Sequence, residues 1–283
     1  MFRLTLITML LVLASTVLSA GVPAASRGEY SLFHPTPDSL LRDLSTDRPD
    51  LTESPYTVDA GHVQFEMDLV GYAGDDSEGY RTESWGMAPF IVKLGLSNST
   101  DLQLVLEPHR RVHVTVLATG ASSEIWGFGD AGIRLKLNLW GDDGGSTAFA
   151  LMPFVKIPTA EDAIGNGAWE WGLIVPFAVA LPGEFGAGLM GEVDLLEDED
   201  GEGRHAAWVA TATLSRDVTG PLGAFVEIAS TTRPRDEGRW VGTFDVGITL
   251  GVGRDVQLDG GVLLGLSEAA DGRAFFLGLA VRR

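Results

Sequence analysis

The sequence predicts an all-β protein: an antiparallel transmembrane β-barrel of about 12 strands, with an N-terminal signal peptide and a short N-terminal plug-like segment. Three observations predict this fold. Polar and apolar residues alternate along many segments, the connections alternate between short and long, and no later segment approaches the roughly 18 uninterrupted apolar residues of a helical span. Successive side chains of a strand lie on opposite faces, so one face can meet lipid and the other a polar lumen.

The N-terminus has the pattern of a secretory signal peptide. Arg3 precedes an apolar run over residues 4–18, and small residues follow it. The run is shorter than the roughly 20 residues of a spanning helix, which makes an uncleaved anchor the less favoured alternative. We expect a signal peptide over residues 1–20 with cleavage between 19 and 24. An N-terminal extension with the plug-like segment would follow over 21–60, and the barrel over 61–283.

Composition restricts the partners of the chain. Its net charge is −19, which argues against binding to a phosphate backbone. The chain contains 0 Cys, so disulfides cannot stabilise it. We expect outer-membrane lipid, the barrel-assembly machinery and a small-molecule solute as partners, and no nucleic acid.

The clearest alternation begins at His62, where the apolar residues at odd positions 63–69 oppose Glu66 and Asp68. Residues 101–116 and 130–139 repeat the pattern, and weaker versions follow. The expected strands cover residues 62–69, 81–97, 101–116, 130–139, 147–158, 168–181, 185–195, 205–216, 221–233, 239–250, 255–266 and 273–282.

The connections form two sets that alternate along the chain. The short set comprises residues 98–100, 141–145, 182–184, 218–220 and 251–254. The longer or more charged set comprises residues 74–80, 117–128, 159–167, 197–203, 234–238 and 267–272. Outer-membrane barrels have short periplasmic turns and longer external loops, so both ends of the mature chain are expected in the periplasm. The alternative is a soluble β-sandwich or lipocalin-like barrel, which does not explain polar faces so rich in ionisable groups.

The plug-like segment contains Asp47, Arg48, Asp50 and Glu53 between turn-forming prolines. Insertion into the lumen would supply fixed charges of opposite sign, and a periplasmic tether is the alternative. The expected lumen residues are Glu66, Asp68, Glu107, His109, Arg111, Asp130, Arg134, Lys136, Lys156, Arg239 and Asp245. The expected cationic partners of the segment are Arg134, Lys136, Lys156 and Arg239. The candidate partners of Arg48 are Glu66, Asp68, Asp130 and Asp245.

No pattern for catalysis, cofactor binding or metal binding is strong. His109 and His113 lie on a strand where alternate residues are about 7 Å apart, which is long for ligands of one ion. The acidic run 197–202 lacks the ligand spacing of an EF-hand. Residues 122–124 and His205 leave a lipase-type or protease-type barrel enzyme as an alternative, but the Gly-x-Ser-x-Gly motif is missing. We expect no enzyme, no cofactor and no metal site.

Residues 46–55, followed by Val58, residues 61–62 and residues 64–66, resemble the opening of the outer-membrane family described as "putative MetA-pathway of phenol degradation". Residues 127–130 leading to Lys136, and residues 153–159, look like later signatures of the family. The resemblance covers the chain from about residue 45 to its end. It implies a Gram-negative outer-membrane channel or transporter-like barrel for small solutes, with hydrophobic or aromatic compounds suggested by the family description. A structural or surface barrel without an open pore is the alternative.

The chain departs from the family pattern in two places. Residues 26–44 form an extension in which Leu40, Leu41 and Leu44 suggest a short helical turn. The chain also ends at Arg283 instead of the terminal aromatic residue of many outer-membrane barrels.

Overall fold

The computed structural model describes residues 27–86, 89–161, 164–198, 201–232 and 240–283. The expected signal peptide, residues 1–20, and the expected lumen residue Arg239 lie outside these residues. No helix among the described residues is long and apolar enough to cross a bilayer.

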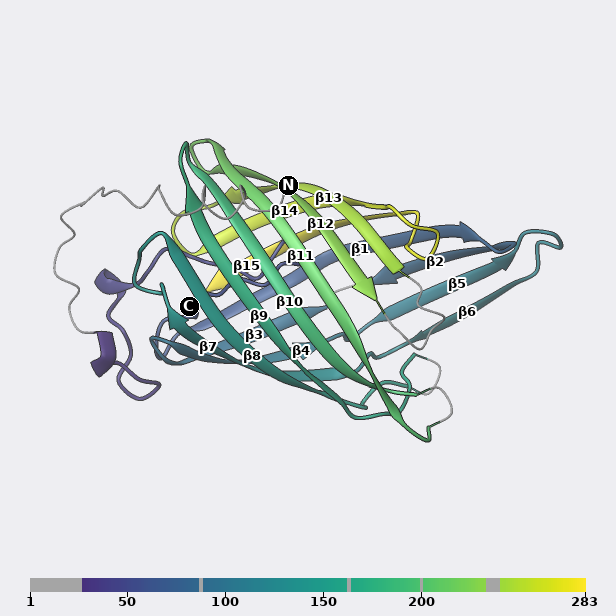
Figure 1. The fold of residues 1–283 in the computed structure, drawn as a ribbon, viewed down its shortest axis with the longest axis horizontal. Helices are drawn as coiled ribbons and strands as arrows, with labels where there is room; N and C mark the ends of the chain where they lie inside the picture. Colours follow the sequence, from purple (N-terminus) through teal and green to yellow (C-terminus); the bar gives the residue numbers. More distant parts are fainter. Residues whose placement is uncertain (1–26, 87–88, 162–163, 199–200, 233–239) are drawn as a thin grey trace, which may run out of the picture.

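The described strands form one antiparallel sheet that closes into a barrel, because β1 pairs with β3 on one side and with β15 on the other (Figure 1). The barrel contains 12 strands, as the alternation predicts. They are β1 (Val63–Ser77), β3 (Phe90–Ser97), β4 (Thr100–Leu106), β7 (Ala131–Trp140), β8 (Thr147–Ile157), β9 (Glu170–Leu181), β10 (Phe185–Glu197), β11 (Arg204–Thr219), β12 (Leu222–Thr232), β13 (Trp240–Gly251), β14 (Val256–Gly265) and β15 (Arg273–Arg282).

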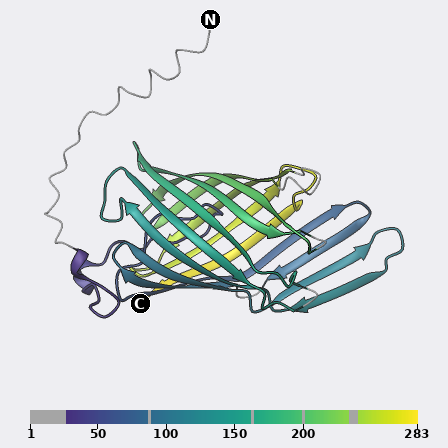
Figure 2. The same ribbon diagram turned by 60° about the horizontal axis from the view of Figure 1, so that its bottom comes forward.

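Three further strands, β2 (Tyr80–Gly86), β5 (Arg110–Val116) and β6 (Ser122–Gly127), continue the sheet beyond the barrel from the second half of β1. Figure 2 shows them projecting at one end. The expectation that 74–80 and 117–128 are connections therefore holds only for residues 78–79, 117–121 and 128, and the remainder is strand. The expected strands 81–97 and 101–116 are each divided, and Pro89 and Pro108 lie at the divisions. Proline has no backbone N–H to donate, so it interrupts the ladder of hydrogen bonds.

The barrel exposes apolar side chains and buries polar ones. Phe65, Ile133 and Ile248 are exposed on the outside, whereas Glu66 and Lys136 are buried inside. A water-soluble protein has the reverse distribution. This arrangement and the single closed sheet exclude the soluble alternatives and make the chain a transmembrane β-barrel.

An aromatic row marks the outer face where the barrel meets the projecting strands. Tyr72 lies in register with Phe275 and with Trp85, and its ring centroid is 5.3 Å from the first and 4.7 Å from the second. Phe276, which follows Phe275 on β15, points into the barrel, where its ring lies under the guanidinium of Arg48. Such aromatic girdles lie at the membrane–water interface of outer-membrane barrels.

Residues 27–44 lie at the barrel end that carries the short turns, opposite the β5–β6 hairpin (Figure 1). Their helical turns are the 3-10 helices η1 (Arg27–Glu29) and η2 (Asp38–Leu40). Ser31 forms a β-bridge with Ser97 beside the β3–β4 turn. Arg254, in the β13–β14 turn, donates to the carbonyl oxygens of Asp38 and Leu41 at 2.6 and 2.5 Å. The described part of the extension therefore lies against the turns at this end of the barrel.

Candidate functional site

Residues 45–58, called here the lumenal segment, pass through the interior of the barrel. Gln64 on β1 donates to the carbonyl oxygen of Ser45 at 2.8 Å, and Asn138 on β7 donates to that of Pro55 at 2.9 Å. Contacts described below reach β11, β12 and β14 as well. Because strands all around the wall contact one segment, the segment lies in the lumen.

Asp47 is the most completely buried charge of the lumenal segment. Its carboxylate accepts a hydrogen bond from Nζ of Lys136 at 2.5 Å and forms an ion pair with Lys93, which also pairs with Glu66. Gln103 donates to the same carboxylate at 3.2 Å. Burial alone would raise the pKa of Asp47, but Lys136 and Lys93 hold it well below its usual range. Asp47 is therefore an ionised bridge between β3 and β7.

Arg48 forms a second anchor, near the β1–β15 pairing that closes the sheet into a barrel. Its Nη2 lies 2.8 Å from Asp259 on β14 and its Nη1 lies 2.6 Å from Asp68 on β1. A Cβ on Gly278 would lie 1.9 Å from Nη2 of Arg48, so only glycine leaves room for the guanidinium there. One guanidinium thus joins two carboxylates from neighbouring parts of the wall.

Glu227 on β12 forms the third anchor. Its carboxylate accepts hydrogen bonds from the backbone N–H groups of Leu51 and Thr52, both at 2.8 Å, and from the Thr52 hydroxyl at 2.5 Å. That hydroxyl also lies 2.6 Å from the hydroxyl of Thr211 on β11. One residue further on, Glu53 pairs with Arg134 on β7 at 2.5 Å. The segment is therefore held on opposite walls at once.

Two carboxyl groups of the lumenal segment have negative charges that nearby cations neutralise only in part. Burial, followed by repulsion from Glu227, raises the pKa of Asp50 to about 7. Burial also raises the pKa of Glu53 to about 7, against the attraction of Arg134. Both groups therefore change charge near neutral pH.

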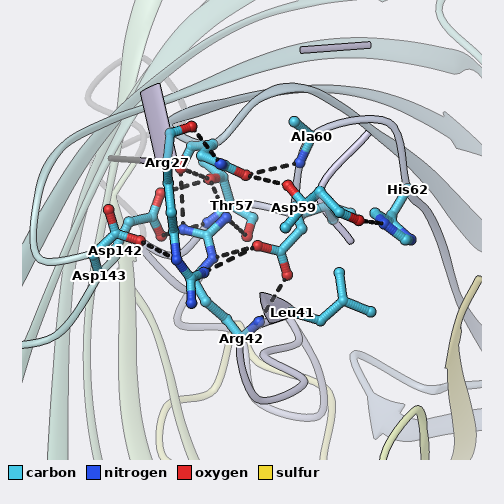
Figure 3. A network of polar contacts seen from close by, with 12 residues as sticks. Arg27, Leu41, Arg42, Thr57, Asp59, Ala60, His62, Asp142 and Asp143 are labelled. Atoms are coloured by element: carbon cyan, nitrogen blue, oxygen red, sulfur yellow. Dashed lines mark hydrogen bonds and ion pairs between the residues drawn. The ribbon is translucent and has the colours of Figure 1, made fainter. Parts of the chain in front are cut away.

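A polar network holds the segment where it leaves the barrel at the short turns (Figure 3). Asp59 accepts hydrogen bonds from Nε and the backbone N–H of Arg42 at 2.9 and 3.0 Å. Arg42 also pairs with Asp142 in the β7–β8 turn at 3.0 Å, and the Thr57 hydroxyl donates to the same carboxylate at 2.5 Å. A Cβ on Gly95 would lie 2.1 Å from the Asp59 carbonyl oxygen, so the chain passes directly against β3.

The lumenal segment leaves a cavity of about 460 Å³ between itself and the wall formed by β9–β13. Thr46, Asp50 and Tyr56 line one side of the cavity. Apart from Phe225, the inward-facing residues of the opposite wall are mostly small, among them Ala178, Gly186, Gly188, Thr213, Gly223 and Thr249. Most ion pairs of the segment therefore lie on the β1–β8 side of the lumen, whereas the cavity lies on the β9–β13 side.

Two of the four expected cationic partners, Arg134 and Lys136, contact the segment. Lys156 pairs instead with Asp130 at 3.0 Å and with Glu170 at 2.8 Å, so its expected contact with the segment is wrong. Glu170 is its register partner on β9 and is the nearer carboxylate.

Asp68 is the one expected partner of Arg48 that does contact it. The other described contact is with Asp259, which sequence reasoning missed. In the described structure, no ion pair with Arg48 is formed by the remaining three candidates, Glu66, Asp130 and Asp245.

Three expected lumen residues fall at or beyond the proline break between β4 and β5. The break shifts the alternation by one residue, so Arg111 lies in register with the outward-facing Trp85 and pairs with Glu124 at 2.5 Å. The ring of His109 lies 6.3 Å from that of Trp126, the outward neighbour of Arg111. The expectation that His109 and Arg111 face the lumen is wrong. Glu107 lines a separate cavity.

The residues weighed for an enzyme have other contacts. His205 Nδ1 lies 2.8 Å from Asp198. Residues 122–124 form part of β6, not a loop, and Glu124 binds Arg111. Among the described residues, no group of three His, Cys, Asp or Glu side chains is arranged to hold a metal ion.

Sequence reasoning missed Lys93, Asp259 and Glu227, which are major anchors of the segment. Each is the only charged residue of its strand, β3, β14 and β12 respectively. A lone charge in an otherwise uncharged barrel strand must face the lumen, since the lipid side would leave it unsolvated. The signal depends on the strand bounds seen in the structure, because the predicted strands 81–97, 221–233 and 255–266 each contain at least one further charged residue.

The barrel is similar to several solved structures. The NanC porin is 8% identical, with 77% of this chain and 98% of that chain covered and a TM-score of 0.49. The transport unit of the autotransporter AIDA-I from Escherichia coli is 10% identical, with 86% and 93% covered and a TM-score of 0.47. The beta domain of the Bordetella autotransporter Brka is 12% identical, with 78% and 98% covered and a TM-score of 0.48. A search of curated proteins found no match.

The apolar exterior, polar lumen and closed antiparallel sheet place the chain in the bacterial outer membrane. The family model described as "Putative MetA-pathway of phenol degradation" matches residues 46–282, which is most of the chain. The chain therefore belongs to this family.

Proposed function

We propose that the protein is an outer-membrane channel for small solutes, in which the lumenal segment acts as a plug at the end with short turns. The observation that carries the proposal is the cavity between the ion-paired segment and the small-residue wall of β9–β13. A segment that served only as a tether would not need the three separate anchors on Asp47, Arg48 and Thr52.

We further propose that residues 1–20 are a signal peptide, that residues 21–60 form the extension and plug, and that residues 61–283 form the barrel. The solutes to test first are small aromatic compounds, because the family description refers to phenol degradation. The proposed role is passage, not catalysis, and the barrel-assembly machinery is the proposed partner in insertion.

Planar-bilayer recording of the refolded protein tests the proposal. Arg48→Ala removes one anchor, and deletion of residues 46–55 removes the plug. Both should raise single-channel conductance while heat-modifiable folding is retained. Arg81→Ala is the matched control, because Arg81 forms an exposed ion pair with Asp76 on the projecting strands.

The possible results separate the alternatives. Unchanged conductance in folded Arg48→Ala and deletion variants would show that the segment is a tether. No conductance from any folded form, the deletion variant included, would favour the structural barrel without a pore.

A further inference from the structure

The charges that face the lumen are divided between two sides of the barrel. The cations Lys93, Arg134 and Lys136, which bind the lumenal segment, all lie on β3 and β7. Strands β9, β10, β12 and β13 contain no lysine or arginine within their described bounds. On β11, Arg204 and Arg216 lie over the rings of Trp171 and Phe185, at 4.3 and 4.9 Å from the centroids. By the alternation of β11, both are on the face opposite to Thr211, which contacts the segment.

Carboxylates face the lumen on the side that lacks cations. Met190 contacts the backbone N–H of Glu53, so the alternation of β10 also turns Glu192 and Asp194 inward. Glu227 contacts the lumenal segment, and Asp245 on β13 lies directly opposite Glu227 in register. Like charges in directly opposed positions of a sheet repel each other.

Asp245 has no compensating neighbour in the described structure. It is 2% exposed, and neither of its carboxylate oxygens has a hydrogen-bond partner. Its cross-strand neighbour Glu227 is 1% exposed and already accepts three hydrogen bonds from the segment. Two directly opposed carboxyl groups with no cation between them do not readily ionise together, so the pair shares a proton and keeps one negative charge in the space around it.

These carboxylates lie next to the cavity on the same strands. On β12 the cavity-lining Phe225 is followed by Glu227 at the next inward position. On β10 the cavity-lining Gly188 is followed by Met190 and then Glu192. Asp50 and Glu53 of the segment line the cavity directly, together with Arg48, whose charge is paired with Asp68 and Asp259. A solute that passes from the cavity towards the long-loop end must therefore pass these carboxylates.

We propose that the route past the plug is selective for small cations and neutral solutes and rejects anions. The inference rests on the proposed channel function and specifies its solute class. Acidic rings act in this way in other cation channels, because a negative potential in a narrow polar passage concentrates cations and excludes anions.

The test is the reversal potential of the refolded full-length protein in a planar bilayer under a potassium chloride gradient. The wild type should be more permeable to potassium than to chloride. At about pH 9, where opposed carboxyl groups ionise together, Asp245→Asn and Glu192→Gln should each lower the permeability ratio by about twofold or more, because each then removes one lumenal charge. Asp76→Asn, on the exposed projecting strands, should leave the ratio unchanged.

Two variants keep the test decisive if one fails to fold, with heat-modifiable mobility as the check on folding. Conduction that favours chloride, or an unchanged ratio in the folded lumenal variants, would overturn the inference and leave the channel intact. Absence of conduction in the wild type and in the plug-deleted protein would overturn the channel proposal and this inference with it.

Discussion

Gly278→Ala should release the Arg48 anchor without changing the segment itself. The added Cβ would lie 1.9 Å from Nη2 and 2.4 Å from Cζ of Arg48. The clash is with the far end of a flexible side chain, so the barrel should fold and the guanidinium should move. Its contacts with Asp259 and Asp68 would then be lost. Hydrogen bonds to charged groups contribute roughly 1.5–3 kcal/mol each, and solvation of the freed groups offsets part of that.

We therefore expect docking of the segment to weaken by about 2–4 kcal/mol, or roughly 30-fold to 1,000-fold in the equilibrium between docked and released states. Thiol labelling can measure this directly, because the chain has 0 Cys. Thr52→Cys introduces a single buried thiol but also removes the Thr52 hydroxyl from Glu227, so both proteins carry it. In this shared background the labelling rate should rise when Gly278→Ala is added. Single-channel conductance should rise in parallel.

Gly191→Ala is the matched control, because a Cβ at Gly191 would meet nothing within 4 Å. It adds the same methyl group to a barrel strand and should change neither labelling nor conductance. The reasoning would be refuted if folded Gly278→Ala protein labelled and conducted like the wild type.

Three further predictions address the faces of the wall, pH and topology. Leu135→Arg should cost about 2–4 kcal/mol of barrel stability if Leu135 lies near the membrane midplane, whereas Lys136→Leu should mainly raise conductance. Denaturant titration measures the first effect and bilayer recording the second. If the two effects were exchanged, the assigned register of the strand would be wrong. The pKa values of Asp50 and Glu53 rise from 3.8 and 4.5 to about 7 in the docked state, which therefore holds more protons than the released state across that range. Docking should weaken as pH rises from about 4.5 to 7, so labelling at position 52, relative to an exposed cysteine, should be faster at pH 7 than at pH 5; no pH dependence would contradict the assignment. Protease added to intact cells should cut the β10–β11 loop and spare the β7–β8 turn, and the opposite pattern would reverse the topology.

The sequence by itself determined the barrel and its 12 strands, because alternation is a local property that each strand displays separately. It also identified the charged motif of the lumenal segment and two of its cationic partners, Arg134 and Lys136. It did not place Arg111, because the continuous alternation through residues 101–116 hid the effect of one proline on the ladder. A shift of a single residue exchanges the two faces of a strand.

Only the tertiary structure decided which charges meet. Arg48 and Asp259 are separated by 211 residues, and they contact each other because the pairing of β1 with β15 closes the sheet. Alternation indicates that a side chain faces the lumen, but not at which height or against which strand. These depend on the registers of all 12 strands together. For the same reason the direct opposition of Glu227 and Asp245 is visible only once β12 and β13 are aligned.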